Sequence, residues 1–203
     1  MSLNRIPYVA DCINGIDQLI SVNDWVLIKE RKIYLTGPVD DEIAHTVTME
    51  LDYLNNKSVD DPITLVINSP GGSVTAGLAI YDAMQNVDCP VVTVCSGICA
   101  SMGAVLFAAG SKGKRYIMEN AEVMCHQPSA GTQGMVSSMD IDIDHFKKTR
   151  TRLNRILAKH TGKSENQIHK DTERDRWFSA EEAVSYGLAD EIVYSKRKEY
   201  CGE

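Results

Sequence analysis

Residues 97–104 (Gly-Ile-Cys-Ala-Ser-Met-Gly-Ala) constrain the fold of this chain more than any other stretch. The β-branched run at residues 91–94 before them favours a buried strand, and the small apolar run at residues 104–109 after them favours a helix. The sequence therefore predicts a strand, a tight turn and a helix, with Ser101 at the turn.

A serine at such a junction has two interpretations. The unpaired N–H groups at a helix N-terminus favour a developing oxyanion, so Ser101 is a candidate nucleophile. Serine is also a preferred N-cap residue, so the alternative is a side chain that only caps the helix. A membrane span over residues 91–110, although near the required length, is disfavoured because Pro90 and the internal glycines and serines break it into short pieces.

Composition limits the classes of function. A chain of 203 residues with 43% hydrophobic content can bury one core, which predicts a single domain. The net charge of −7 argues against nucleic acid or an anionic membrane as the main partner. The sequence has no recognisable signal peptide, and its six cysteines form no CxxC pair, so we expect a cytoplasmic protein with reduced thiols.

The remaining pattern predicts an α/β fold of strand–helix–strand units. Residues 63–67 (Ile-Thr-Leu-Val-Ile) form a near-continuous apolar strand, typical of a sheet covered on both faces. This strand leads into Asn-Ser-Pro-Gly-Gly-Ser and a further helix. Without a lysine or a GxGxxG pattern, this turn is a poor candidate for nucleotide binding, and we expect its glycine N–H groups to face another atom.

Two further stretches contain candidate catalytic groups. His126 closes a predicted strand at residues 121–126, at the edge where α/β sites assemble, although it could equally be a structural histidine. Residues 171–178 combine acids with Trp177 and Phe178, which we expect to draw one acid inward. His45, His145 and His160 are predicted to be solvated.

A long helix is predicted at residues 136–159, longer than this core needs. Its apolar stripe is expected to pack against another subunit, and it comprises Met139, Ile143, Phe146, Leu153 and Leu157. Residues up to about 29 are predicted to form a short amphipathic helix or a mobile arm, and the tail at residues 195–203 is predicted to be flexible.

Several motifs in order resemble the Clp serine peptidase family, the proteolytic component of the ATP-dependent Clp protease. They run from about Lys29 to Val193 and are LTGPVDDEIA, INSPGGSVTAGLAIYDAM, GICASMGAVL, HQP, DTERDRWFSAEEA and YGL. The resemblance implies a crotonase-like fold of repeated βαβ units, with a projecting long helix used for ring stacking. It also implies a gate region at residues 1–28 and a peptidase domain at residues 29–194 with a handle around residues 129–160.

The resemblance implies a Ser-His-Asp triad and no metal. Ser101 corresponds to the nucleophile, His126 to the base and Asp175 to the acid, whereas the nearby Asp171 and Glu173 are not selected by the family pattern. The backbone N–H groups of Gly72 and Met102 correspond to the oxyanion donors.

The same resemblance implies a partner and an assembly. Two heptameric rings would stack into a tetradecamer through the long helix and Glu173-Arg174, enclosing a chamber for protein and peptide substrates. An AAA+ unfoldase would use ATP, so this chain would need no cofactor of its own.

Three alternatives remain. Residues 11–26 and the SAGT after His-Gln-Pro depart from the usual family pattern, which allows a paralogue of low activity alone that serves in a mixed ring. A catalytically idle ring subunit is the second alternative. The third is a crotonase-type acyl-CoA enzyme, which would need no nucleophilic serine.

Overall fold

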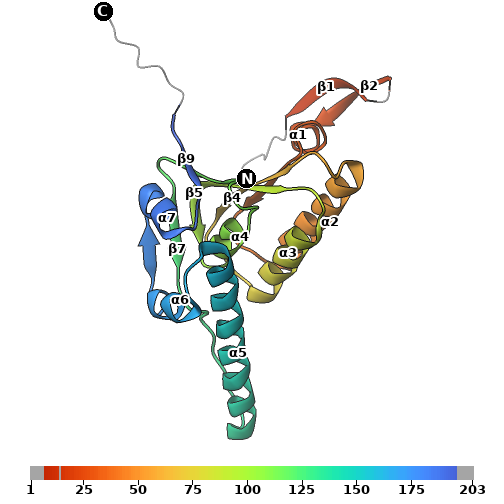
Figure 1. The fold of residues 1–203 in the computed structure, drawn as a ribbon. Coiled ribbons are helices and arrows are strands. Elements are labelled where there is room, and N and C mark those ends of the chain that lie inside the picture. Colours follow the sequence, from red (N-terminus) through yellow and green to blue (C-terminus); the bar gives the residue numbers. More distant parts are fainter. Residues whose placement is uncertain (1–6, 14, 196–203) are drawn as a thin grey trace, which may run out of the picture.

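A computed structural model describes residues 7–13 and 15–195 (Figure 1). Its central sheet has seven described strands, and five of them lie side by side as parallel neighbours. In spatial order these five are β3 (Lys32–Thr36), β4 (Ile63–Ser69), β5 (Val91–Ala100), β6 (Arg115–Met118) and β9 (Glu191–Val193). The two others are β7 (Glu122–Cys125), which pairs with β5, and β8 (Arg176–Phe178), which pairs with β7.

Helices connect successive parallel strands and confirm the expected βαβ units. They are α2 (Asp41–Lys57) between β3 and β4, α3 (Val74–Asn86) between β4 and β5, and α4 (Met102–Ala108) between β5 and β6. Asp40 and Ser73 cap α2 and α3 by accepting hydrogen bonds from backbone N–H groups three residues on. The helices bury apolar faces on the sheet, where the side chains of Ile63, Leu65 and Ile67 are fully buried.

Strand β5 changes partner halfway along its length. Residues 93–95 pair with β6, whereas residues 98–100 pair with β7. Gly97 lies between the two halves with φ of +94°, a conformation that glycine adopts most readily. As a result, the carboxyl end of β5, which leads into Ser101, lies beside β7 rather than beside β6.

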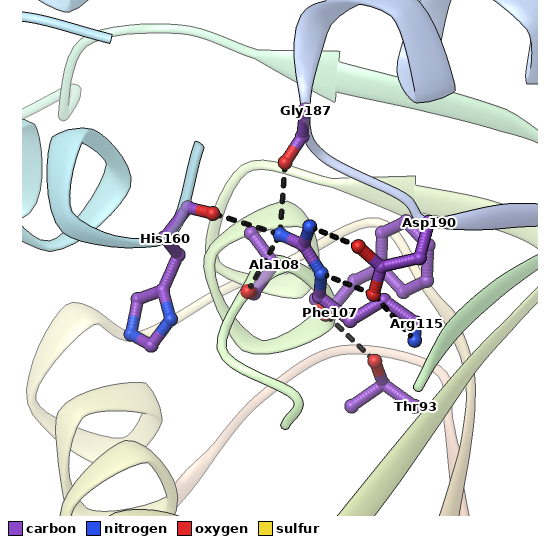
Figure 2. Close-up of polar contacts among 7 residues, drawn as sticks. All are labelled: Thr93, Phe107, Ala108, Arg115, His160, Gly187 and Asp190. Atoms are coloured by element: carbon purple, nitrogen blue, oxygen red, sulfur yellow. Dashed lines mark hydrogen bonds and ion pairs between the residues drawn. The ribbon is translucent and has the colours of Figure 1, made fainter. Parts of the chain in front are cut away.

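Arg115 connects the carboxyl ends of three helices to the sheet (Figure 2). Its Nη1 donates to the carbonyl groups of Ala108 in α4, of His160 in α5 (Val136–Thr161) and of Gly187 after α7 (Ala180–Tyr186). Nε and Nη2 bind both carboxylate oxygens of Asp190. Burial opposes ionisation of Asp190, but Arg115 lowers the pKa of that carboxyl below its usual value. A cation therefore satisfies helix-terminal carbonyls that have no partner within their own helices.

Helix α5 extends well beyond the rest of the fold (Figure 1), and its bounds agree with the predicted residues 136–159. Its second half packs into the core through Leu153, Ile156 and Leu157, whereas Val136 and Ile141 in its first half are largely exposed. Phe146 is partly buried and lines a cavity within its own chain. The helix is followed by α6 (Glu165–Asp171).

The prediction of a solvated His160 is wrong. Its ring is half-buried, with Nε2 at 3.1 Å from the hydroxyl of Tyr81. Burial, together with the charges of Lys159 and Arg115, lowers the pKa of His160 to about 4.

The N-terminal region is more regular than the sequence indicated. Strands β1 (Tyr8–Ile13) and β2 (Ile16–Ser21) form an antiparallel hairpin, and α1 (Val22–Glu30) follows with Ser21 as its N-cap. The Asn-Gly pair between the strands is a hairpin signal, and Gly15 adopts a φ of +80°. The apolar residues that suggested a helix lie on the two strands of this hairpin instead, with Ile13 on β1 and Ile16, Leu19 and Ile20 on β2.

No helix within residues 7–13 and 15–195 has the length and apolar character needed to cross a membrane. The described cysteines are free thiols, and all except Cys12 are buried. The predicted flexible tail lies outside the described residues from residue 196 onward.

Candidate active site

Ser101 occupies the turn between β5 and α4 with an unusual backbone. Its φ and ψ are 54° and −119°, a conformation that costs a non-glycine residue about 1–3 kcal/mol and occurs most often at functional sites. Although Ser101 stands at the N-cap position of α4, its side chain caps no backbone N–H. The structure therefore does not support the interpretation of Ser101 as a simple helix cap.

The hydroxyl of Ser101 contacts His126 instead, which directly follows β7. The distance from His126 Nε2 to Ser101 Oγ is 2.9 Å, and the distance from His126 Nδ1 to Asp175 Oδ1 is 3.2 Å. His126 is thus placed between a hydroxyl and a carboxylate, with 25% of its side chain exposed. The three residues expected to form a triad lie together, although 74 positions separate the first from the last.

The other two acids of this segment have different partners. Asp171 is the acid that is drawn inward, with 14% of its side chain exposed against 65% for Asp175. Burial opposes ionisation of Asp171, but contacts from Gln167, Tyr186 and Arg176 lower its pKa below the usual value. Glu173 pairs with Arg150 of α5.

Strand pairing explains why Asp175 reaches His126. Because β8 runs antiparallel to β7 with Arg176 opposite Cys125, the residue before β8 lies opposite the residue after β7. Gln127 strengthens this arrangement, since its backbone N–H donates to the carbonyl of Thr172 and its side chain donates to the carbonyl of Glu173. Gln127 lies within the His-Gln-Pro motif, but nothing in the sequence pattern indicated this positioning role.

The glycine turn after β4 packs directly against Ser101. A Cβ atom at Gly71 would lie 2.6 Å from the Cβ of Ser101, and one at Gly72 would lie 2.2 Å from the carbonyl oxygen of Val39. Side chains are therefore excluded from both positions. Within the described residues, the backbone N–H groups of Gly72 and Met102 donate no hydrogen bond, which leaves both available to another acceptor.

An apolar pocket lies beside the Ser101–His126 pair. Its walls combine aliphatic side chains with the thiol of Cys125 and the amide of Asn154; the full lining is Val74, Ser101, Met102, Val105, Cys125, His126, Pro128, Leu153, Asn154 and Leu157. Burial raises the pKa of Cys125 to about 12, so this thiol stays protonated and acts as part of the wall. Its volume is about 20 Å³, room for about one water molecule, so these side chains leave little free space next to Ser101.

The parallel βαβ fold brings a serine hydroxyl, an imidazole and a carboxylate to one edge of the sheet, which defines the class as an α/β protein with a hydrolase-type site. Within the described residues, no three or more histidine, cysteine or acidic side chains cluster in a way that could hold a metal ion. A family model described as Clp protease matches residues 18–196. The chain belongs to the Clp protease family.

Proposed function

We propose that this chain is the proteolytic subunit of an ATP-dependent Clp protease and a serine endopeptidase. The observation that carries the proposal is the position of His126, within hydrogen-bond distance of Ser101 on one side and of Asp175 on the other. A hydroxyl becomes a useful nucleophile only when a neighbouring base takes its proton, and this arrangement supplies that base.

The proposed mechanism follows from these contacts. His126 Nε2 takes the proton of Ser101 Oγ as the oxygen attacks the carbonyl carbon of the substrate peptide bond. Asp175 holds the imidazole through Nδ1 and stabilises its charged form. The N–H groups of Gly72 and Met102 donate to the oxyanion, and His126 then gives its proton to the leaving amine. Water releases the acyl group by the reverse sequence of proton transfers.

Assembly, partner and energy source form part of the proposal. Membership of the family implies an oligomer that works with a Clp unfoldase. We propose two stacked heptameric rings in the cytoplasm, formed by this chain alone or mixed with a paralogue. The chain itself uses no cofactor, because the triad needs only protein groups, and ATP is consumed by the AAA+ partner.

The alternatives differ in what they require of Ser101. A crotonase-type enzyme would use the glycine turn to bind a thioester carbonyl and would have no need of the Ser101–His126 contact. An idle ring subunit would have no need of it either. A paralogue that works mainly in mixed rings would keep the contact but would show low turnover alone.

Labelling with a fluorophosphonate reagent separates these functions. We expect one covalent adduct per chain, located at Ser101 by mass spectrometry, and no adduct in the Ser101→Ala variant. An unlabelled Ser101 in properly assembled protein would reject the peptidase proposal. Measuring hydrolysis of a fluorogenic peptide before and after a second ring subunit is added distinguishes the mixed-ring alternative, which predicts a large rise in turnover.

A further inference from the structure

A large pocket lies at the amino end of β5, whereas Ser101 follows the carboxyl end of the same strand. The volume of this pocket is about 530 Å³, within the range of about 300–1,000 Å³ that is usual for small-molecule sites. Among the described residues, none lines both this pocket and the smaller one at Ser101. An occupant of the large pocket would therefore leave Ser101 and His126 free.

Different elements supply the apolar and the polar parts of this pocket. Apolar side chains come mainly from the end of α3 and the start of β5, and they include Met84, Val87 and Val91. The turn at residues 111–114, between α4 and β6, supplies Ser111, Lys112 and Lys114. An occupant that satisfies both parts has an apolar body and one polar group.

The turn at residues 111–114 carries hydrogen-bond donors that have no acceptor in the described part of the chain. Ser111 Oγ accepts from the backbone N–H of Val91 at 3.0 Å, and its own O–H donates to no group there. The backbone N–H of Lys112 donates no hydrogen bond, and the ammonium groups of Lys112 and Lys114 form no ion pair. These donors remain available to an acceptor that enters the pocket.

The charge at this pocket is positive. Lys112 and Lys114 outnumber Asp88, the acidic residue of the lining. Lys159 brings a third ammonium group to the border, since its Nζ lies 3.4 Å from Oε1 of Gln85, which also lines the pocket. The whole chain has a net charge of −7, so the pocket is a local reversal of charge that attracts an anion.

Arg115 prevents the neighbouring helix ends from cancelling this charge. The carbonyl groups at the C-terminus of a helix carry partial negative charge, but Arg115 donates to those of Ala108 in α4 and His160 in α5 (Figure 2). The ring of His160 points away from Arg115 and lines the pocket. Burial, with the charges of Lys159 and Arg115, lowers the pKa of His160 to about 4, so this ring is uncharged at neutral pH.

A protein partner is a less suitable occupant. The large apolar side chains that are exposed in the described part of the chain, such as Tyr34, Val136 and Ile141, do not line this pocket. Surfaces that dock proteins usually contain a patch of such side chains. A concave pocket with a few polar groups on one turn is instead typical of a small-molecule site.

We propose that this pocket binds a small molecule that carries an acidic group on an apolar body. The acidic group, a carboxylate or a phosphate, lies against Ser111, Lys112 and Lys114, and the apolar body packs against the end of α3. The site goes beyond the proposed function, because its ligand does not take part in peptide hydrolysis at Ser101.

Isothermal titration calorimetry of the assembled protein with octanoate, octyl phosphate and octanamide tests the proposal. The three probes share an apolar chain, but only the first two carry a negative charge. We expect saturable binding of at least one acid, with octanamide weaker by about ten- to a hundredfold because it cannot form charge-assisted hydrogen bonds. The order of the two acids identifies the acidic group that the site prefers.

A pair of double variants tests the role of the lysines. Lys112→Met combined with Lys114→Met removes both charges and should weaken binding of the preferred acid by at least about tenfold. The matched control is Lys57→Met combined with Lys170→Met, which removes two exposed lysines that do not line the pocket. This control should keep the affinity of the unsubstituted protein.

A second pair of variants tests the position of the apolar body. Val87→Trp fills the pocket from the end of α3 and should abolish binding. Asn86→Trp, at an exposed neighbouring position outside the lining, should retain it. If Val87→Trp does not fold, the lysine variants still test the proposal, because the side chains of Lys112 and Lys114 are exposed.

Three outcomes would overturn the site. The first is the absence of saturable binding of either acid up to about 10 mM. The second is an affinity for octanamide equal to that for the acids. The third is unchanged affinity in the protein that carries both Lys112→Met and Lys114→Met.

Binding at this pocket and chemistry at Ser101 are tested separately. The Ser101→Ala variant should bind the preferred acid within about twofold of the unsubstituted protein, because the two pockets have no lining residue in common within the described ranges. Loss of binding in Ser101→Ala would place the probe at the candidate active site and overturn the separate site. Failure of Ser101 labelling would reject the peptidase proposal and leave the calorimetric result unaffected.

Discussion

Arg176 binds Asp171 with an Nη1–Oδ1 distance of 2.5 Å. The same guanidinium lies 4.9 Å from the ring centres of Phe178 and Tyr186, and the Tyr186 hydroxyl donates to Asp171. Asp171 therefore belongs to a half-buried network with Arg176 and Tyr186 beside the candidate active site. That network anchors the end of the segment that brings Asp175 to His126.

Replacing Asp175 by Asn should lower kcat by about 10⁴, because an amide at this position favours the wrong imidazole tautomer. Steady-state hydrolysis of a fluorogenic peptide measures the effect. Asp171→Asn is the matched control, and we expect it to lower stability slightly while leaving most of kcat. A larger loss of kcat in Asp171→Asn would mean that Asp171 is the catalytic acid.

Ser101→Ala should abolish peptide hydrolysis, with a loss of kcat of about 10⁶, while the fold and particle mass stay unchanged. The substitution removes only the hydroxyl, which caps no backbone group. Circular dichroism and mass photometry serve as the controls for folding and assembly. Substantial peptidase activity in this variant would contradict the assignment of the nucleophile.

Gly72→Ala should lower kcat by roughly 10²–10³, the usual cost of losing one oxyanion donor. The added Cβ would lie 2.2 Å from the carbonyl oxygen of Val39 and would displace the backbone N–H from its position. The control is Gly131→Ala, because an added Cβ there meets nothing within 4 Å. Equal kcat values for the two variants would show that the Gly72 turn has no role in the reaction.

Ile141→Glu should separate stacked rings and reduce peptidase activity. The Ile141 side chain is 71% exposed in a single chain, so we expect the facing ring to cover it. A charge buried without a partner at that contact costs on the order of a few kcal/mol. Mass photometry beside a peptide assay measures both effects, with the exposed Lys148→Glu as control. Full activity in a particle no larger than one ring would contradict the link between assembly and catalysis.

His160 should make the free energy of unfolding depend on pH. The folded-state pKa of about 4 lies below the ordinary value of 6.5, so the folded state binds fewer protons than the unfolded state between these values. The free energy of unfolding should therefore fall as the pH is lowered from about 6.5 to about 4. Urea unfolding at several pH values measures this trend.

The control for this pH effect is His160→Gln, which cannot titrate but can still contact Tyr81. Its unfolding free energy should change less over the same range of pH. An identical pH dependence in both proteins would assign the effect to other groups.

Local sequence determined most of the architecture. Apolar strands, capping residues such as Asp40 and Ser179, and the glycine turns specified βαβ units, because these signals act over a few residues. The N-terminal hairpin was the exception, since Ile16, Leu19 and Ile20 lack the alternation typical of a strand and their spacing was mistaken for that of a helix.

Tertiary structure decided the relationships among distant groups. Periodicity assigned Phe146 to the same stripe as Ile143, and only the tertiary structure shows that it lines a cavity of its own chain together with Leu78 of α3 and Pro128. The burial of His160 likewise depends on Tyr81 and Arg115, which approach it from other parts of the chain.

The motifs of the sequence selected Ser101, His126 and Asp175, but spacing alone could not distinguish Asp175 from Asp171. The antiparallel register of β7 and β8 distinguishes them, because it places the residue before β8 opposite His126 while Arg176 binds Asp171. Strand register depends on pairing between segments about 50 residues apart, a long-range contact that no local pattern encodes.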